Sequence, residues 1–322
     1  MINLGIVGSG MIVHDFLSIA DQVPDLNLAA ISTTKRSEKI GQELAQKYNI
    51  TKTYTDNEQL YNDSNVNTVY VAVPNNLHYD VAKAALLAGN NVICEKPFVD
   101  TPEQARELKQ IADEKGVFLV EAITNIYLAN FAYLKAHLDQ IGPIHDVALN
   151  YTQYSSRYDD FLKGIIKPVF DPAKDGGALM DIGIYNIHLA VGLFGKPKTV
   201  HYFPVMQKDI DTSGTLMLSY DGMQASLLAA KDSYVTDQWS YIEGEKGTLK
   251  IKGSIGQLNE IELDLKGKEP KKVDLNKYND RMVAEFVEFS RMFKQKDKVA
   301  ADKAFDHSLA TLEVLYTAKK QK

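Results

Sequence analysis

The chain has 322 residues, of which 45% are hydrophobic and 24% are charged. This length exceeds what one hydrophobic core usually organises, so two domains are expected, and the composition excludes a disordered or fibrous protein. The formal net charge is −6, from 36 basic and 42 acidic residues. Broad nucleic-acid binding is not expected, because such binding needs a basic face.

Cysteine content and hydropathy indicate the compartment. Cys94 is the only cysteine, so the chain forms no internal disulfide and gives no sign of an oxidising environment. The first residues lack the basic segment and cleavage site of a signal peptide, and no apolar run approaches the ~18 residues of a membrane span. No cysteine pair or histidine-rich spacing predicts a metal site. We expect a cytoplasmic protein without a membrane partner.

Residues 1–122 alternate short apolar runs with amphipathic stretches. This rhythm predicts a parallel, doubly wound α/β sheet as the first domain. Thr101 opens the last helix of the region, with Pro102 in its first turn. The expected strands cover residues 2–7, 26–32, 53–55, 66–73, 91–95 and 117–122, and the expected helices cover residues 11–22, 36–47, 77–88 and 102–114.

Residues 123–322 follow a different pattern. Longer runs that alternate apolar and polar residues predict a mostly antiparallel sheet, and Asp221-Gly222 is a hairpin signal between two of them. We therefore expect a second domain of the α+β class. Its strands lie within residues 145–154, 213–231 and 247–253, and its helices cover about residues 128–140, 178–194, 278–294 and 301–318.

The turn after the first expected strand reads GSGMIV, residues 8–13. Gly8 and Gly10 fit the dinucleotide-binding fingerprint G-x-G-x-x-G/A, in which they permit a tight turn and the approach of a pyrophosphate to a helix N-terminus. Val13 stands where a third glycine or alanine is usual. A plain βα turn would also explain a lone G-x-G, but the strand–helix–strand context favours a nucleotide site. Its expected residues are Gly8, Gly10, Met11 and Ile12.

The second expected strand ends in Ser32, Thr33, Thr34, Lys35 and Arg36. An NAD site would place an acidic side chain here to accept a hydrogen bond from the ribose hydroxyl. The small hydroxyls and two cations instead offer room and positive charge for a 2′-phosphate. We interpret this run as an NADP site, with NAD as the alternative. The non-functional explanation is a solvated helix start with stray cations.

The fourth expected strand is followed by Pro74, Asn75 and His78. Pro74 stops the strand because it cannot donate a ladder hydrogen bond, and Asn75 can cap the next helix. In the functional interpretation, Pro74 and Asn75 line the cofactor cleft and His78 approaches the nicotinamide.

The fifth strand runs directly into Glu95-Lys96-Pro97. An exposed ion pair at a strand end contributes only about 0–1 kcal/mol, so stability alone gives little reason for it. The carboxyl ends of parallel strands share one edge, where ligands usually bind. We therefore interpret Glu95 and Lys96 as a pair that faces a bound ligand. Whether the Lys96–Pro97 bond is cis is left open.

The segment 171–188, DPAKDGGALMDIGIYNIH, combines a glycine pair with a helix. Asp181, Tyr185 and His188 are spaced i, i+4, i+7, which places them on one helix face. An acid, a phenol and an imidazole on one face suit proton handling and substrate binding. The alternative is a half-buried face with internally satisfied polar groups, which applies most to His188.

The run NYTQYSSRY, residues 150–158, carries alternating tyrosines. Tyr154 could stack on a sugar, with Arg157 as a polar anchor. Equally, this run could form one face of a sheet that packs on a partner subunit. Both explanations stay open at this point.

Four motifs together resemble a known family. GIVGSGMI, VAVPNNLH, EKP and DGGALMDIGIYNIH, in this order, look like the glucose-fructose oxidoreductase, inositol dehydrogenase and MocA family. Tyr185 and LVEAI at 119–123 are similar to its dihydrodiol and xylose dehydrogenase branch. The resemblance implies an N-terminal Rossmann domain, a C-terminal open-faced sheet that carries the substrate site and the interface of a homodimer or higher oligomer, and hydride transfer with NAD or NADP on a sugar, polyol or related small molecule.

The resemblance also implies individual roles. Lys96 matches the family's catalytic lysine, Tyr185 the catalytic tyrosine of the dihydrodiol branch, and Asp181 the aspartate one turn earlier. Val13 departs from the fingerprint, and TNIYLANF at 124–131 lacks the Trp-x-Arg-Phe pattern of that branch, which puts the branch's substrates in doubt.

These assignments predict reversible oxidation of a secondary alcohol, with Tyr185 taking the hydroxyl proton. An unperturbed tyrosine has a pKa of ~10, so Lys96 is expected to favour the phenolate while it holds the reacting oxygen. Asp181 is expected to orient one of these groups. The alternatives are a non-catalytic NADP sensor of the same fold, and a reductase of an imine or tetrapyrrole.

Overall fold

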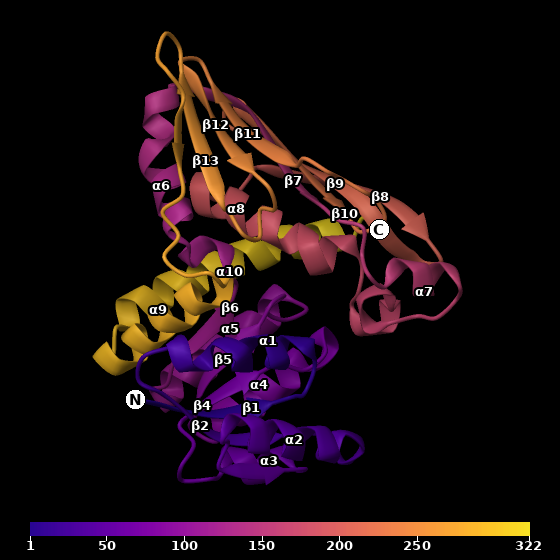
Figure 1. Ribbon diagram of the computed structural model, residues 1–322, viewed down its shortest axis with the longest axis vertical. Helices are drawn as coiled ribbons and strands as arrows, with labels where there is room; N and C mark the ends of the chain where they lie inside the picture. Colours follow the sequence, from indigo (N-terminus) through magenta and orange to yellow (C-terminus); the bar gives the residue numbers. More distant parts are fainter. The chain divides into compact units, whose positions relative to one another are not determined.

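The computed structural model describes residues 1–322 as two compact units (Figure 1). The first comprises residues 1–122 and 282–309, and the second comprises residues 123–281 and 310–322. Residues 282–309 thus belong to the first unit, whereas the sequence analysis places everything after residue 122 in one second domain.

The first unit is a Rossmann fold, as expected. Its six parallel strands follow the order β3-β2-β1-β4-β5-β6, with the topological switch between β1 and β4. Ligands bind at the carboxyl edge of such a sheet, beside the switch point. The strands are β1 (Ile2–Val7), β2 (Leu26–Ser32), β3 (Lys52–Tyr54), β4 (Thr68–Val71), β5 (Asn91–Glu95) and β6 (Leu119–Ala122); the helices are α1 (Met11–Ile19), α2 (Glu38–Tyr48), α3 (Asn57–Tyr61), α4 (His78–Leu87) and α5 (Pro102–Lys115).

Helix α9 (Arg281–Gln295) supplies apolar side chains to the core of the first unit. The Phe286 ring lies 4.4 Å from the Phe16 ring and 5.3 Å from the Tyr70 ring, measured between centroids. Ser290 donates a hydrogen bond to the carbonyl oxygen of Pro24. The amphipathic pattern of α9 predicts that one face is buried, but not in which core. Helix α10 (Lys298–Lys319) contributes residues to both units.

The second unit is built on an eight-stranded sheet with the order β14-β13-β12-β11-β7-β10-β9-β8. Only β7 and β10 pair in parallel. The expected mostly antiparallel sheet and the hairpin at Asp221-Gly222 are both present. The strands are β7 (Ile144–Thr152), β8 (Thr199–Gln207), β9 (Ile210–Tyr220), β10 (Met223–Ala230), β11 (Trp239–Gly244), β12 (Gly247–Lys252), β13 (Glu260–Leu265) and β14 (Lys271–Val273).

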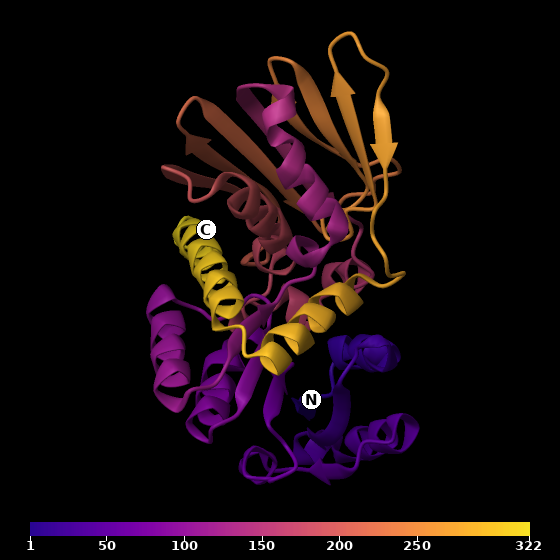
Figure 2. The same cartoon turned by 90° about the vertical axis from the view of Figure 1, so that its left-hand side faces the viewer.

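Helices α6 (Ala129–His137) and α8 (Ile184–Phe194) lie on one face of this sheet (Figure 2). Helix α8 packs against β7 and β10, and α6 packs against β13. Residues 172–194 are long and apolar enough to cross a membrane by composition alone, but 83% of the apolar window is buried inside the structure. A core helix explains this apolar run.

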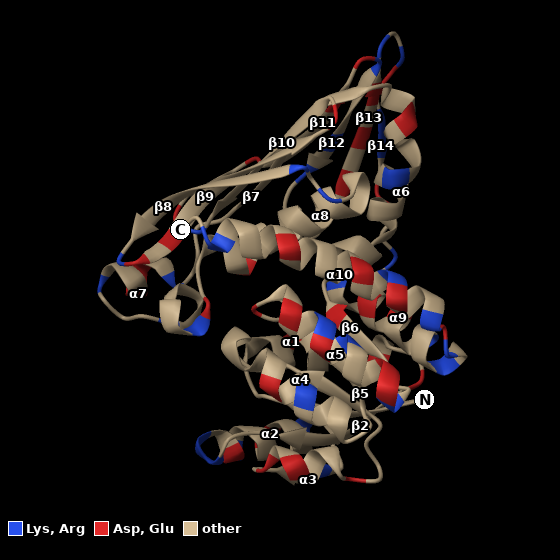
Figure 3. Ribbon diagram, turned by 180° about the vertical axis from the view of Figure 1, so that it is seen from behind, with Lys and Arg blue, Asp and Glu red and all other residues tan.

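The two ends of the sheet differ in charge, and Figure 3 shows charged residues along β13 and β14. At one end, Lys250 on β12 pairs with Glu262 and Asp264 on β13. At the other end, Phe203 and Val205 on β8 are 62% and 53% exposed. One end of the open face is therefore ionic, and the other is apolar.

Candidate functional site

The glycine turn in the first unit shows why each glycine is needed. Gly8 has φ of +126°, and a Cβ at this position would lie 2.2 Å from the carbonyl oxygen of Ala72, so only glycine fits. A Cβ at Gly10 would meet no protein atom within 4 Å. Gly10 is the N-cap of α1, without a side-chain cap. The open space before this helix N-terminus fits a pyrophosphate. Val13 is fully buried and packs in the core where the fingerprint has its third small residue.

The end of β2 corrects part of the predicted phosphate site. Ser32 is fully buried and donates a 2.6 Å hydrogen bond to Asn57, and Thr33 is 6% exposed. Their hydroxyl groups therefore lie inside the protein and do not face a phosphate at the surface. Thr34, Lys35 and Arg36 are exposed in the turn that leads into α2. Because Gly8 donates a backbone hydrogen bond to Ser32, this cationic turn begins beside the glycine turn.

His78 has a structural place instead of the predicted place at the nicotinamide. Its ring is fully buried, with Nδ1 2.9 Å from the carbonyl oxygen of Pro97 and Nε2 3.0 Å from that of Val73. Burial lowers the pKa of His78, against the opposing effect of these carbonyls. The ring thus ties the chain after β4 to the chain after β5. Pro74 and Asn75 lie in the turn between β4 and α4, where Pro74 is exposed.

Glu95 and Lys96 do not share one role. Glu95 is 7% exposed; it accepts a 2.5 Å hydrogen bond from the Tyr70 hydroxyl and a 3.2 Å bond from the backbone N–H of Lys96. Burial, reinforced by Glu95, raises the pKa of Tyr70, so this phenol stays a donor. Glu95 therefore braces the main chain instead of facing a ligand. Lys96 is half-buried, and its bond to Pro97 is cis.

In the second unit, Asp181 lies on a π-helical turn, Leu179–Gly183, and pairs with Lys231. Lys231 is 2% exposed and its Nζ lies 5.5 Å from the centroid of the Phe170 ring, whereas the Asp181 side chain is 31% exposed. A buried ammonium needs such a partner, because an unpaired buried charge is strongly unfavourable. The pair therefore presents a carboxylate, an acceptor of hydrogen bonds, at the surface of the unit. The sequence analysis missed Lys231, although a lysine directly after the apolar run SLLAA was a signal.

The turn before Asp181 depends on a second carboxylate. Asp211 is fully buried and accepts hydrogen bonds from the Leu179 N–H (2.8 Å) and the Tyr202 hydroxyl (2.7 Å). Gly177 has φ of +109°, and a Cβ there would lie 2.0 Å from Asp211 Oδ1. Gly177 thus makes room for the carboxylate at the start of this helix, whereas a Cβ at Gly176 would lie 2.8 Å from the Pro168 carbonyl oxygen.

Tyr185 lies among aromatic and cationic neighbours from distant segments. It is 5% exposed, its ring lies 5.6 Å from the Tyr151 ring, and the Arg281 guanidinium carbon lies 5.2 Å from its centroid. Asn125 donates a hydrogen bond to the Tyr185 carbonyl. A cation beside a phenol favours its ionised form. Arg281 and Tyr151 were not among the predicted site residues, because only the fold brings them to Tyr185.

His188 does not share a surface with the other two members of the predicted helix face. It is fully buried within α8, which argues against the predicted contact with substrate. The spacing i, i+4, i+7 assumes a regular α-helix, and the π-helical turn at Asp181 changes the phase. The structure favours the other explanation for His188, that it is a polar group of the interior.

Tyr154 and Arg157 lie after β7. Tyr154 is 44% exposed, donates a 2.7 Å hydrogen bond to Asp159, and forms an isolated β-bridge with Asp232. Arg157 precedes the short helix α7 (Tyr158–Leu162) and donates to Ser156. Since Asp232 follows Lys231 in the chain, this segment neighbours the Asp181–Lys231 pair.

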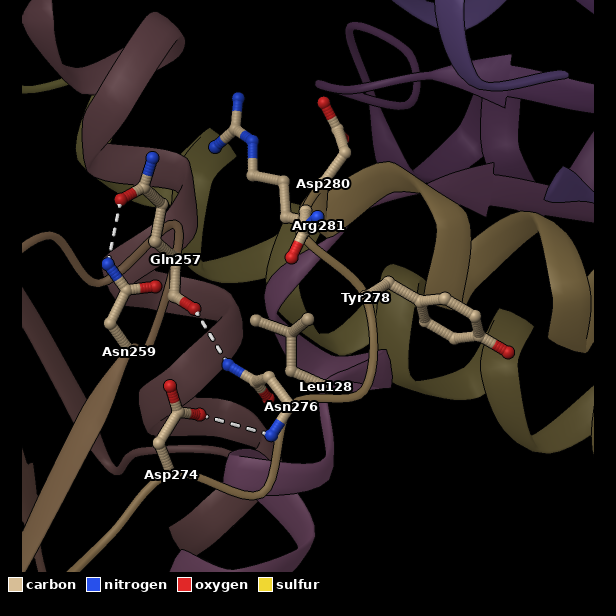
Figure 4. A pocket seen from close by; sticks show the side chains of 9 residues that line it. Leu128, Gln257, Asn259, Asp274, Asn276, Tyr278, Asp280 and Arg281 are labelled. Atoms are coloured by element: carbon tan, nitrogen blue, oxygen red, sulfur yellow. Dashed lines mark hydrogen bonds between the residues drawn. The ribbon is translucent and has the colours of Figure 1, made fainter.

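A pocket of about 360 Å³ opens in the second unit next to Arg281 (Figure 4). Its walls come from the start of α6, the loop before β13 and the segment after β14. The structure holds no cluster of three or more His, Cys, Asp or Glu side chains that could bind a metal ion. The lining residues are Leu128, Gln257, Asn259, Asp274, Asn276, Tyr278, Asn279, Asp280 and Arg281.

Comparison with known proteins gives consistent matches. A family model described as an oxidoreductase family with an NAD-binding Rossmann fold matches residues 2–122, and one described as a GFO/IDH/MocA C-terminal domain matches residues 131–250. The chain is 34% identical to scyllo-inositol 2-dehydrogenase (NADP(+)) IolU of Bacillus subtilis, with 100% of this chain and 97% of that protein covered. It is 29% identical to trans-1,2-dihydrobenzene-1,2-diol dehydrogenase of Mus musculus, with 77% and 73% covered. The solved structure of KijD10, a 3-ketoreductase from Actinomadura kijaniata in complex with NADP and TDP-benzene, superposes with a TM-score of 0.85 at 20% identity, covering 99% and 97%.

Proposed function

Because the chain belongs to the GFO/IDH/MocA oxidoreductase family, we propose that it interconverts a secondary alcohol and a ketone of a sugar or polyol with NADP as the cofactor. NAD(P)-dependent oxidoreduction is the activity of the family. A relative matched over the whole chain acts on inositol, and one matched over 77% of it acts on a dihydrodiol. The named NADP dependence of IolU and the cations after β2 both support NADP over NAD.

The first unit holds the cofactor, which supplies or accepts the hydride when bound. Gly8 and Gly10 let the main chain and the N-terminus of α1 receive the pyrophosphate. Thr34, Lys35 and Arg36 bind the 2′-phosphate as exposed donors. Met11 and Ile12 open α1 at the same edge.

The second unit handles the proton. Tyr185 takes the hydroxyl proton in oxidation and returns it in reduction. The Arg281 guanidinium beside its ring favours the phenolate that a base requires. Lys96 of the first unit is the residue proposed to hold the reacting oxygen. Asp181, which pairs with Lys231, accepts a hydrogen bond from a substrate hydroxyl and so orients the substrate ring.

One observation supports the proposal most strongly. The Asp181–Lys231 ion pair lies one turn before Tyr185, and the Arg281 guanidinium lies beside the Tyr185 ring. A regulator that only senses NADP has no need for a buried ammonium beside an exposed carboxylate. A substrate that is an imine or a tetrapyrrole would not need a hydroxyl acceptor. Both alternatives are therefore less consistent with this geometry.

The test is reduction of NADP by the purified protein with a panel of inositols, hexoses and trans-dihydrodiols, and oxidation of NADPH with cyclic imines and biliverdin. We expect reduction of NADP with at least one polyol. Lys96→Met and Tyr185→Phe should each lower kcat/KM by ~10²- to 10⁴-fold, as loss of a general acid–base group does, while NADP still binds. Tyr48→Phe, on the far side of the Rossmann unit in α2, is the matched control. Binding of NADP without turnover of any compound, or near-native turnover by both variants, contradicts the proposal.

The open face of the second unit supports a homodimer or higher oligomer. Phe203, Val205 and Leu228 are exposed on β8 and β10, the two strands that flank β9, and such apolar patches commonly mark interfaces. Replacing Phe203 with Asp should yield a smaller species in sedimentation, whereas Lys272→Asp at the ionic end should not. A cytoplasmic location remains part of the proposal, supported by the single, buried Cys94.

A further inference from the structure

The pocket beside Arg281 is lined almost entirely by groups that form hydrogen bonds. Of its nine lining residues, only Leu128 is apolar. Four are carboxamides, which offer both donors and acceptors, and two are carboxylates, which only accept when ionised. A ligand with many neutral hydroxyl groups matches this mixture. A phosphorylated ligand would face Asp274 and Asp280, and an apolar ligand would find almost no apolar surface.

The size of the pocket limits the ligand. About 360 Å³ lies near the lower end of the ~300–1,000 Å³ typical of small-molecule sites. This volume has room for one small ring, whereas a dinucleotide needs a longer cleft.

The pocket is held in shape by a buried side chain beneath it. Asn130 is fully buried; its Nδ2 donates to the carbonyl oxygens of Leu258 and Asn259 and to Asp274 Oδ1, and its Oδ1 accepts from the Leu275 N–H. These bonds link the loop before β13 to the segment after β14. Two opposite walls are thus fixed by one residue, and a fixed wall lowers the entropy cost of binding.

The pocket is adjacent to Tyr185. Arg281 lines it and also places its guanidinium carbon 5.2 Å from the Tyr185 ring centroid. Its Nη1 lies 3.5 Å from the Gly256 carbonyl oxygen, which keeps the guanidinium near this position. Figure 4 shows Arg281 and Gln257 on the same side of the pocket. One residue therefore contacts both the acid–base tyrosine and the polar pocket.

We propose that this pocket binds the second, non-reacting ring of a substrate made of two linked sugar or polyol rings. The first ring reacts at Tyr185, the linkage crosses Arg281, and the hydroxyls of the second ring bind to the carboxamides and carboxylates. This assignment rests on the proposed function, because it extends the substrate of the same site.

The test compares one-ring and two-ring probes with the same reacting ring: glucose with maltose and cellobiose, and myo-inositol with galactinol. We expect a higher kcat/KM for the two-ring member of at least one pair. Asn279→Ala should lower that preference about tenfold, the effect of losing hydrogen bonds to a substrate hydroxyl. Asn279 is exposed and lines the pocket, so the variant is expected to fold; Asn259→Ala is the second variant. Lys277→Ala, exposed on the same segment but outside the lining, is the control.

Binding without turnover separates this inference from the function it extends. Saturation-transfer NMR on the Tyr185→Phe protein with NADP should show contact with both rings of the preferred two-ring probe, and loss of the contact to the second ring in Tyr185→Phe/Asn279→Ala. Equal kcat/KM within every pair, together with no contact to the second ring, overturns the pocket assignment even if one-ring polyols are turned over. Full activity of Tyr185→Phe would instead overturn the proposed function, and the NMR comparison would still decide the pocket.

Discussion

At the carboxyl edge of the first unit the main chain determines the local geometry, whereas in the second unit charged side chains and their partners determine it. Gly8 and Gly10 matter because they have no side chain, and the His78 ring only ties two loops together. Asp181 and Tyr185 depend on Lys231 and Arg281, which come from distant parts of the chain. We therefore expect the glycine turn to be disrupted by substitutions that add a side chain. The paired charges should be disrupted by substitutions that remove one.

The comparison is tested most severely by Asp181→Asn. This change leaves the Lys231 ammonium, which is 2% exposed, without the carboxylate that pairs with it, and an uncompensated buried charge costs about 3 kcal/mol or more. We expect a lower free energy of unfolding in urea and a kcat/KM at least tenfold lower. Lys231→Met/Asp181→Asn should recover much of the stability but not the activity. If Asp181→Asn alone kept both properties, the charge pair would not organise this site.

Alanine at the two fingerprint glycines sharpens the comparison within the first unit. Gly8→Ala places a methyl group against the Ala72 carbonyl at a positive φ, so we expect a loss of about 1–3 kcal/mol in unfolding free energy. Gly10→Ala meets no protein atom, so its stability should be near that of the native protein, while its Kd for NADP rises because the methyl group stands where the pyrophosphate approaches. Thermal unfolding with and without NADP separates the two effects. Equal stability losses would contradict this account of Gly10.

Arg36→Ala tests the one place in the first unit where side chains are expected to matter. Loss of a charged hydrogen bond to the 2′-phosphate should raise the ratio of KM for NADP to KM for NAD about tenfold. Lys39→Ala, an exposed lysine of α2 that pairs with Glu43, is the control. An unchanged ratio in Arg36→Ala would mean that the cations after β2 are only a solvated helix start.

The smallest expected effect is on stability and concerns Asp63, a buried carboxylate of the first unit outside the proposed cofactor site. Burial alone would raise the pKa of Asp63, but hydrogen bonds from Asn65, Lys52 and Tyr54 lower it to about 2. Because the folded pKa is below the usual 3.8, this carboxylate stabilises the protein above about pH 4, and the contribution disappears as the pH falls through about 2. Asp63→Asn should therefore cost about 1–2 kcal/mol at pH 7, with no loss of kcat/KM. Urea titrations at pH 7 and pH 3 should show the difference between the two proteins shrinking with acid.

The same contrast explains what the sequence could predict. The parallel sheet, the glycine turn and the helix start at Thr101-Pro102 follow from local patterns, and the structure has all three. Lys96, Asp181 and Tyr185 stand out because their chemistry is unusual for their positions. Local patterns do not reveal partners, so Lys231 and Arg281 were missed.

The incorrect predictions have physical causes. Ser32 and His78 are polar residues at strand ends, and a sequence does not show whether such a group turns toward solvent or toward backbone carbonyls. His188 was placed by counting 3.6 residues per turn through a segment that has a π-helical turn. The assignment of residues 282–309 depends on which of two apolar cores receives the Phe286 side chain.

The position of the Asp211 carboxylate explains why the second residue of the Gly176-Gly177 pair is glycine. A methyl group at Gly177 would overlap Asp211 Oδ1, and the φ of +109° at this position would disfavour alanine even beside a smaller neighbour. Glycine is therefore required at this position for two independent reasons. Anyone who grafts the DGG segment onto another scaffold must transplant the carboxylate with it. The Gly-Gly motif therefore reports a requirement of the fold and does not indicate which substrate is bound.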